Sequence, residues 1–260
     1  MDPLIIIATP NICWLNPAVD YPRTPEAIAE EAARCKEAGA TILHTHAESR
    51  WIETLKAVQR RCDIIVQMGM SSLPIPERMD VFTHRADMVS IILNHHDEAF
   101  AEIDCNVVHT KNELLEYARL CREYGVLPEF EVWHTGSVWN LNYLIQKGAL
   151  DPPYITTLFF NWPGGTWSPG TVEEYFYRRK HMPEGCVCNV SIMGKEQRDI
   201  LVAAIINGDH VRVGTEDYPY THDGRLATTP ELVAETAEMA RALGRPLATV
   251  EQARKMIGLR

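Results

Sequence analysis

The run Thr41-Ile42-Leu43-His44-Thr45-His46 has the β-branched and apolar composition of a strand, and an amphipathic segment, Pro25–Ala38, comes shortly before it. Thr24 followed by Pro25 is typical of a helix start, with a capping residue and a proline in the first turn, and Gly39 is typical of a helix end. This stretch therefore predicts a helix that leads into a strand, which is the repeating unit of α/β folds.

The same alternation continues through the whole chain. The other predicted strands are Leu4–Thr9, Ile64–Met68, Met88–Leu93, Leu127–Trp133, Tyr154–Phe160, Cys186–Ile192 and Val211–Thr215. The other predicted helices are Trp51–Arg60, Lys111–Tyr124, Val138–Lys147, Val172–His181, Lys195–Asn207 and Pro230–Ala242, with a weaker pattern around Pro76–Val81 and a short terminal helix in Val250–Arg260. Eight strands with interleaved helices predict a closed (β/α)8 TIM barrel, and we expect one catalytic domain over residues 1–260. An open doubly wound sheet is the alternative.

Composition narrows the class of protein. The chain has 260 residues, 46% hydrophobic and 23% charged, and it contains no apolar stretch near the ~18 residues of a membrane span. A formal charge of -10 without a cluster of Lys and Arg argues against a nucleic-acid partner. Seven cysteines, scattered through the chain, are not typical of a disulfide framework. We therefore expect a soluble cytoplasmic protein that acts on small molecules.

His44 and His46 are the strongest candidates for chemistry, because residues two apart on a strand point to the same face. Val211–Asp217 is a second strand-like run, and it ends in the carboxylate pair Glu216-Asp217 with Arg212 upstream. Two histidines and one carboxylate would bind zinc and leave a coordination position open for substrate. The alternative is an ordinary histidine pair on a half-exposed strand. In a barrel, however, both runs would end at the face where active sites lie, which favours the metal site.

Other motifs are absent or weaker. The chain has no G-x-G-x-x-G fingerprint, P-loop or G-x-S-x-G elbow, so nothing predicts a dinucleotide, a nucleoside triphosphate or a serine nucleophile. Gly194-Lys195 could hold a phosphate, but a plain turn is more typical. His95 and His96 would face opposite ways on a strand, which disfavours a second metal pair, and His134 is better interpreted as a loop histidine with an ordinary hydrogen bond.

Five stretches, taken in order, resemble one known family along the whole chain. They are Thr24–Ala32, Ala38–His46, Leu127–Val132, His210–Asp217 and Leu243–Thr249, and the Val-Arg-Val-Gly-x-Glu-Asp run is the most specific of them. The chain resembles the β-keto acid cleavage enzymes. This resemblance implies a zinc-dependent barrel that condenses a β-keto acid with acetyl-CoA to give acetoacetate and a new acyl-CoA, and it implies a homotetramer.

The resemblance also implies roles for individual residues. His44, His46 and Glu216 would be the zinc ligands, Asp217 the base, and Arg212 its neighbour. Zinc on the keto oxygen would make the α-carbon more acidic and stabilise the enolate that Asp217 creates. A structural ion pair is the alternative for Arg212 and Asp217.

Glu131, in a Glu-x-Glu-Val strand, and Ser90 match further family positions and would bind substrate. A buried supporting carboxylate and a packing serine are their respective alternatives.

The sequence departs from the family pattern at three places. Glu48 stands where the family has an arginine after the two histidines. After the third strand, the family has a turn of hydroxyl residues and glycines, which this chain lacks, and Ser71 is the nearest hydroxyl residue that remains. Trp14 stands where members that cleave 3-keto-5-aminohexanoate have a carboxylate for the substrate ammonium. Together with Met68 and Met70, Trp14 predicts a substrate with a neutral or apolar tail.

Two other functions stay open at this level. Because of the first two departures, the chain could be a zinc-dependent hydrolase or aldolase-type lyase that does not use coenzyme A. A non-catalytic binding barrel is a third hypothesis, and the intact Arg212, Glu216 and Asp217 argue against it.

Overall fold

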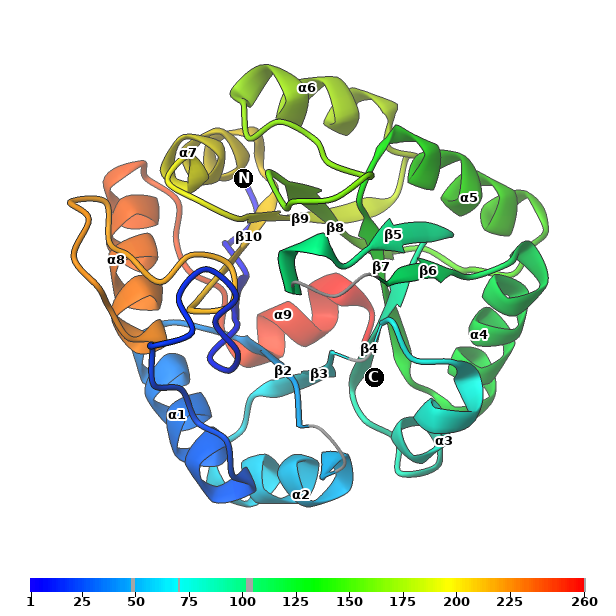
Figure 1. Cartoon of the computed structure of the whole chain (residues 1–260), viewed down its shortest axis with the longest axis horizontal. Helices are drawn as coiled ribbons and strands as arrows, with labels where there is room; N and C mark the ends of the chain where they lie inside the picture. Colours follow the sequence, from blue (N-terminus) through cyan, green and yellow to red (C-terminus); the bar gives the residue numbers. More distant parts are fainter. Residues whose placement is uncertain (48–49, 70, 102–104, 260) are drawn as a thin grey trace.

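The computed structural model describes residues 1–47, 50–69, 71–101 and 105–259. In this part of the chain, eight parallel strands close into a barrel, and β1 pairs with both β10 and β2 (Figure 1). The strands are β1 (Ile6–Ala8), β2 (Ile42–Thr45), β3 (Ile65–Met68), β4 (Met88–Ile92), β7 (Leu127–Val132), β8 (Tyr154–Phe160), β9 (Cys186–Ile192) and β10 (His210–Val213). The closed pairing confirms the predicted TIM barrel and excludes the open doubly wound sheet.

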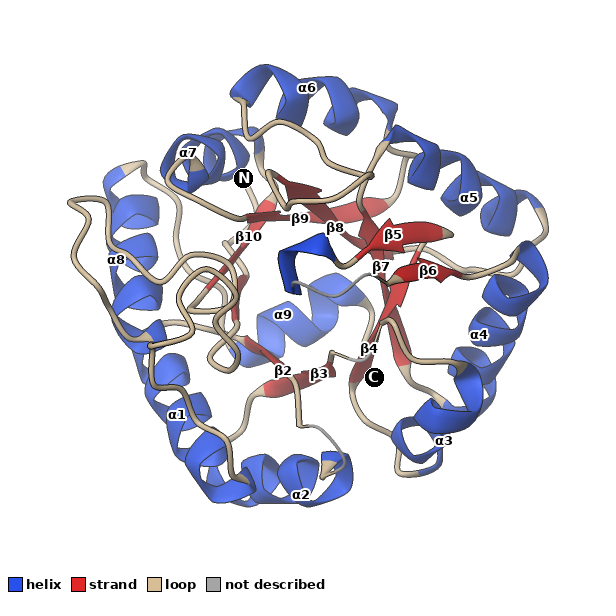
Figure 2. Cartoon of the chain, in the orientation of Figure 1, coloured by secondary structure: helices blue, strands red, loops and turns tan. Residues whose placement is uncertain are grey.

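Helices surround the barrel, as Figure 2 shows by colour. They are α1 (Pro25–Ala38), α2 (Trp51–Arg61), α3 (Ile75–Thr83), α4 (Lys111–Tyr124), α5 (Thr135–Gln146), α6 (Val172–His181), α7 (Gln197–Asn207) and α8 (Thr229–Ala242). The predicted start of α1 is confirmed, because the Thr24 side chain accepts a hydrogen bond from the Ala27 N–H and Gly39 ends the helix with a φ of 122°. None of the described helices combines the length and the apolar character needed to cross a membrane.

A short antiparallel hairpin interrupts the alternation between β4 and α4. It consists of β5 (His95–Asp97) and β6 (Asn106–Val108), with the 3₁₀ turn η1 (Ala99–Ala101) after β5. This hairpin is not among the elements predicted from the sequence. In Figure 2 it lies at the near end of the barrel, opposite α9 (Val250–Ile257), which lies at the far end.

The barrel interior changes from apolar to polar along the strands. At one end, Ala253 and Ile257 of α9 pack against inward-facing residues of the strands, among them Ile42 and Ile65, so the predicted terminal helix closes this end. Two residues further along, the buried positions on the same face of their strands are polar: His44, Gln67, Ser90, Glu129, Thr157 and Asn189. The apolar layer supports the fold, and the polar layer forms the floor of the candidate site at the carboxyl ends of the strands.

Candidate active site

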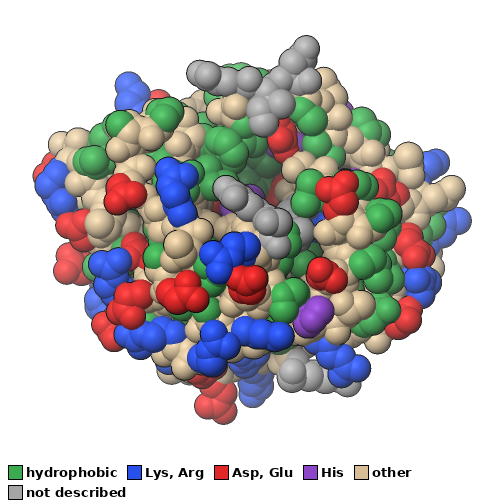
Figure 3. Space-filling model, turned by 60° about the horizontal axis from the view of Figure 1, so that its bottom comes forward, with side chains coloured by type: hydrophobic (Ala, Val, Ile, Leu, Met, Phe, Trp, Pro, Cys, Tyr) green, Lys and Arg blue, Asp and Glu red, His purple; other side chains and the backbone are tan. Residues whose placement is uncertain are grey.

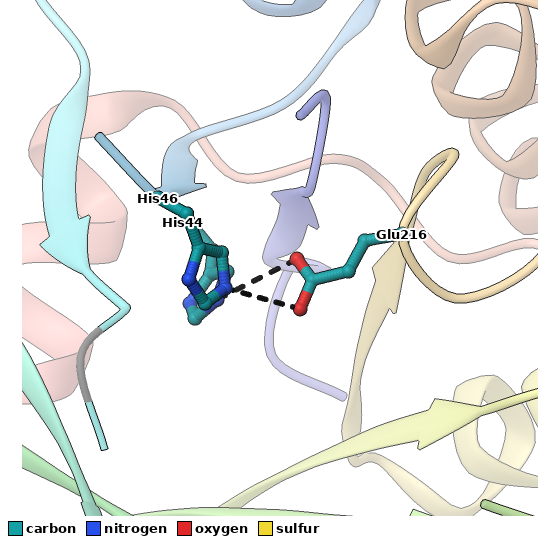
Figure 4. Close-up of side chains that lie close together, drawn as sticks. All are labelled: His44, His46 and Glu216. Atoms are coloured by element: carbon teal, nitrogen blue, oxygen red, sulfur yellow. Dashed lines mark hydrogen bonds and ion pairs between the residues drawn. The ribbon is translucent and has the colours of Figure 1, made fainter. Parts of the chain in front are cut away.

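His44, His46 and Glu216 converge at the carboxyl end of the barrel (Figure 4). The two histidines come from the end of β2, and Glu216 comes from the turn after β10. The Nε2 atoms of the histidines are 3.2 Å apart, His46 Nε2 is 3.3 Å from Glu216 Oε1, and His44 Nε2 is 3.6 Å from Glu216 Oε2. In the described part of the chain, no other group of three or more His, Cys, Asp or Glu side chains is arranged to hold a metal.

Gln67 of β3 fixes the orientation of the His44 ring. Its amide nitrogen donates to Glu129 Oε2 at 2.6 Å, so its amide oxygen faces His44 Nδ1 at 3.3 Å. Nδ1 is then the protonated ring nitrogen, and the lone pair of Nε2 points toward His46 and Glu216. Burial and the nearby Arg212 guanidinium lower the pKa of His44 well below its ordinary value, so the ring is neutral at physiological pH. A neutral, oriented imidazole is the form that ligates a metal.

Three observations test whether these residues fit a divalent metal. Ligand atoms bound at ~2.0 to 2.2 Å in a tetrahedral arrangement lie roughly 3.4 Å from one another, and the three separations given above are close to this value. Glu216 Oε2 is buried and has no hydrogen-bond partner among the described residues. A Cβ atom built on Gly69 would lie 2.6 Å from His44 Nε2 and 2.9 Å from His46 Nε2, so the absence of a side chain keeps this space free. The residues therefore fit a metal ion.

Arg212 of β10 connects two carboxylates. One of its terminal nitrogens, NH2, is 2.8 Å from Glu216 Oε1 and 2.8 Å from Asp217 Oδ1, and Ser191 Oγ donates to Asp217 Oδ2 at 2.9 Å. Burial acts to raise the pKa of Glu216, but the Arg212 guanidinium, His44 and His46 together outweigh it and hold this pKa well below its ordinary value. Burial raises the pKa of Asp217 to about 6, although Arg212 acts in the opposite direction. Glu216 is thus a stable anion, and Asp217 titrates closer to neutrality.

A cavity of about 260 Å³ opens beside the three converging side chains. Figure 3 shows a hollow on this side of the molecule with hydrophobic side chains in its wall and a histidine visible inside. Of the predicted site residues, the cavity is lined by His44, His46, Glu216, Arg212, Trp14, Ser71 and Glu131. A larger cavity of about 630 Å³ lies between β7 and α9 at the other end, but its described lining contains no histidine, so we place the chemistry in the smaller one.

Two predicted site residues do not line this cavity. Asp217 is fully buried behind Arg212, which occupies both of its oxygens. Ser90 is also fully buried, and its hydroxyl donates to the backbone oxygen of Met68 at 3.3 Å. Glu48 and Met70, which the sequence analysis also named, lie outside the described residues.

Glu131 faces the cavity and accepts a hydrogen bond from Trp133 Nε1 at 2.8 Å. Glu129, two residues earlier on β7, is also buried, and its burial together with the negative charge of Glu131 raises its pKa to about 8. Glu129 is therefore protonated at neutral pH and supports Gln67 from the interior of the barrel. His134 does not reach the site, because its Nδ1 accepts from the Gly136 N–H and caps α5, as the sequence analysis favours.

Sequence reasoning missed much of the cavity wall. The missed residues come from the β5–β6 hairpin and from the ends of β7 and β8: His96, Glu98, Phe100, Trp133, Phe159 and Trp162. The sequence feature that could have indicated them is the high density of aromatic residues near strand ends. This feature predicts an apolar pocket, but it does not predict which residues contact one another there.

Comparison with known proteins shows which family the chain is similar to. A family model described as β-keto acid cleavage enzyme matches residues 3–259. The 3-keto-5-aminohexanoate cleavage enzyme of Fusobacterium nucleatum is 30% identical over 284 residues, covering 100% of this chain and 99% of the relative. The 3-dehydrocarnitine:acetyl-CoA trimethylamine transferase of Rhizobium meliloti is 26% identical, covering 92% of this chain and 90% of the relative.

A solved structure of ObcA has the same fold, with a TM-score of 0.76 over 92% of this chain and 65% of its own length, at 18% identity. That identity supports the fold alone. The family match, in contrast, spans both the strand that carries the two histidines and the turn that carries Glu216. The chain therefore belongs to the β-keto acid cleavage enzyme family.

Proposed function

We propose that this enzyme uses a zinc ion held by His44, His46 and Glu216 to cleave a β-keto acid against acetyl-CoA, giving acetoacetate and the acyl-CoA of the remaining fragment. The observation that carries the proposal is the convergence of three ligand atoms, all within 4.8 Å of one another, at the open end of the barrel of a family member. The acetyl group of the thioester joins the substrate's carboxymethyl carbon, and the thiolate takes the acyl fragment left behind, so the atoms balance.

The protein's own groups divide the remaining work. A bound divalent metal supplies Lewis acidity toward the keto oxygen, which weakens the C–H bonds of the neighbouring carbon. Asp217 is our proposed acceptor for that proton, because its pKa of about 6 lies close to neutrality. Arg212, which lines the cavity beside Glu216, would have to release one oxygen of Asp217, and it offers its positive charge to an anionic substrate.

Acetyl-CoA as the second substrate is supported by the relatives. The Rhizobium relative is named for acetyl-CoA, and the family model describes cleavage of β-keto acids. The substrates in the relatives' names differ, so they do not identify the keto acid used here. The aromatic wall favours the neutral or apolar tail predicted from Trp14, whereas the carboxylate of Glu98 in the same cavity favours a positive charge. We also expect the homotetramer implied by the family resemblance, which light scattering after size exclusion can check.

The test is a panel of β-keto acids with zinc-loaded protein, with and without acetyl-CoA, followed by mass spectrometry of the acyl-CoA products. We expect acetoacetate and a new acyl-CoA to appear together and only when acetyl-CoA is present. Metal-stripped protein and its zinc-reconstituted form are the matched controls. Cleavage that proceeds equally without acetyl-CoA would assign the barrel to a hydrolase or an aldolase-type lyase instead.

A further inference from the structure

The outer wall of the cavity carries a carboxylate that the proposed reaction does not use. Glu98 follows β5 and lines the cavity, with 18% of its side chain exposed. The hydrogen bond from His96 lowers the pKa of Glu98 more than burial raises it, and Ser72 lowers it further. A carboxylate kept ionised inside a mostly apolar cavity is unusual unless something of opposite charge meets it.

Aromatic rings line the same cavity as this carboxylate. Phe100 contacts Trp14 with ring centroids 5.3 Å apart and an angle of 74° between the rings, and it contacts Trp162 at 4.9 Å and 87°. Trp133 meets Trp162 at 5.6 Å and 85°. Phe100 and Trp133, in contrast, are stacked with an angle of 3° between their rings. The faces of such rings are electron-rich and can attract a cation.

His96 adds another electron-rich group. Its side chain is 2% exposed, its ring lies 4.0 Å from that of Trp133, and its Nε2 is 3.6 Å from Glu98 Oε1. Nδ1 of His96 is buried and has no hydrogen-bond partner among the described residues, in a side chain that lines the cavity.

Arg212 brings positive charge to the cavity. It lines the cavity beside the three converging ligand atoms, where the acid and keto groups of a β-keto acid would lie, and it is paired there with Glu216 at 2.8 Å. The cavity thus holds a guanidinium paired with a carboxylate beside the ligand atoms, and a second carboxylate, an imidazole and aromatic rings in its wall. One group argues the other way, because Trp162 Nε1 is a buried donor with no partner in the described residues. A single N–H dipole is weaker than the full charge of Glu98.

We infer that Glu98, with His96 and the aromatic wall around it, selects a β-keto acid whose far end is a positively charged amine. This inference rests on the proposed function, and it replaces the neutral or apolar tail that Trp14 alone predicts. In this arrangement Trp14 contributes an electron-rich surface for the cation, and the charge that pairs with the amine comes from the hairpin.

Matched substrate pairs test the inference by activity. One pair is a β-keto acid ending in a trimethylammonium group and its tert-butyl isostere, in which carbon replaces nitrogen; the second pair ends in ammonium and in methyl. We expect kcat/KM to favour the cationic member of at least one pair by ~10-fold or more, and the preferred pair shows whether ring faces or hydrogen-bond acceptors dominate. Glu98→Gln should reduce that preference to near unity.

Glu113→Gln is the matched control, because Glu113 pairs with buried His109 at 3.2 Å and is 25% exposed, yet it does not line the cavity. It should keep the preference for the cationic substrate. A neutral member that reacts as fast as its cationic partner in both pairs would overturn the inference while leaving the proposed reaction intact.

A binding measurement separates this inference from the proposed function. Tetramethylammonium should quench the tryptophan fluorescence of the wild-type protein in a saturable way, and Glu98→Gln should weaken its binding by ~10-fold or more, whereas Glu113→Gln should not. If no keto acid reacts with acetyl-CoA, the proposed function fails, and saturable quenching that requires Glu98 still supports the cation site. Equal quenching of the wild type and Glu98→Gln would refute that site.

Discussion

Gly69→Ala should block the metal site without removing any ligand. The Cβ atom added at this position would lie 2.6 Å from His44 Nε2, 2.7 Å from His44 Cε1 and 2.9 Å from His46 Nε2. To restore ordinary contacts, the rings must retreat by about 0.5 to 0.8 Å, whereas metal–ligand distances tolerate only about 0.2 Å. His44 cannot retreat easily, because it is buried and held by Gln67.

The expected loss of zinc affinity is at least ~100-fold, or about 2.7 kcal/mol. Mutation of a residue that only orients a metal ligand already lowers metal affinity by ~10- to 100-fold, and here the ligands themselves are displaced. Backbone strain is not the cause, because the φ of Gly69 lies outside the left-handed region. Zinc affinity is measured by competition with a chelating indicator, and the fold is checked by circular dichroism and thermal unfolding.

Gly148→Ala is the control for a general effect of replacing glycine. Gly148 has a φ of 65°, and a Cβ there would meet nothing within 4 Å, so the substitution strains the backbone far from the site. It should lower the unfolding temperature and leave zinc affinity unchanged. Binding of one zinc per chain by Gly69→Ala with wild-type affinity would refute the assignment of the converging nitrogens as ligands.

Three further outcomes are expected. His46→Ala should lower the metal content from about one ion per chain to a small fraction, by elemental analysis, and full retention would remove the proposed centre. Asp217→Asn should keep metal and unfolding temperature but lose ~100- to 10,000-fold in kcat, since an amide cannot accept the proton, and near-normal turnover would make Asp217 structural. In the folded protein the buried Glu129 has a pKa of about 8, whereas in the unfolded chain a glutamate loses its proton near pH ~4.3. The stability that protonated Glu129 gives the fold is therefore complete below pH ~4.3 and is lost as the pH rises through 8. Between pH 5 and 8 the free energy of unfolding of the wild type, measured with urea, should fall by up to ~1.4 kcal/mol per pH unit because of this group, and Glu129→Gln should lack that fall. The same pH dependence in both proteins would contradict this assignment.

The barrel could be predicted from sequence because its local signals and its global fold agree. Strands such as Tyr154–Phe160 are buried almost throughout, so they are visible as continuous apolar or β-branched runs. Helices such as Lys111–Tyr124 and Val172–His181 begin after a threonine cap, and their bounds match the prediction.

The β5–β6 hairpin could not be predicted in the same way. Its strands have three residues each, too short to show an alternating pattern, and their partners lie up to 13 residues apart in the chain. Their pairing depends on tertiary contacts over the barrel mouth, so the positions of His96 and Glu98 were not visible.

The candidate site was predictable only where its geometry follows from the fold. His44 and Glu216 meet because both follow strand ends of one barrel. Asp217 shows the limit of this reasoning, because it is adjacent to Glu216 in sequence yet lies behind Arg212, away from the cavity. The partnership of Gln67 with His44 likewise needed the register of β2 against β3.

The closure of one barrel end by α9 also determines how reactants can move. With Ile257 and Ala253 packed into the apolar layer, the far end gives no passage, so a keto acid, a bulky thioester and both products must all use the mouth beneath the hairpin. A keto acid bound at the floor of the cavity, beside the ligand atoms, could neither enter after the thioester nor leave before it. We therefore expect an ordered sequence at this mouth, in which the keto acid binds first and the thioester carrier arrives last and departs first.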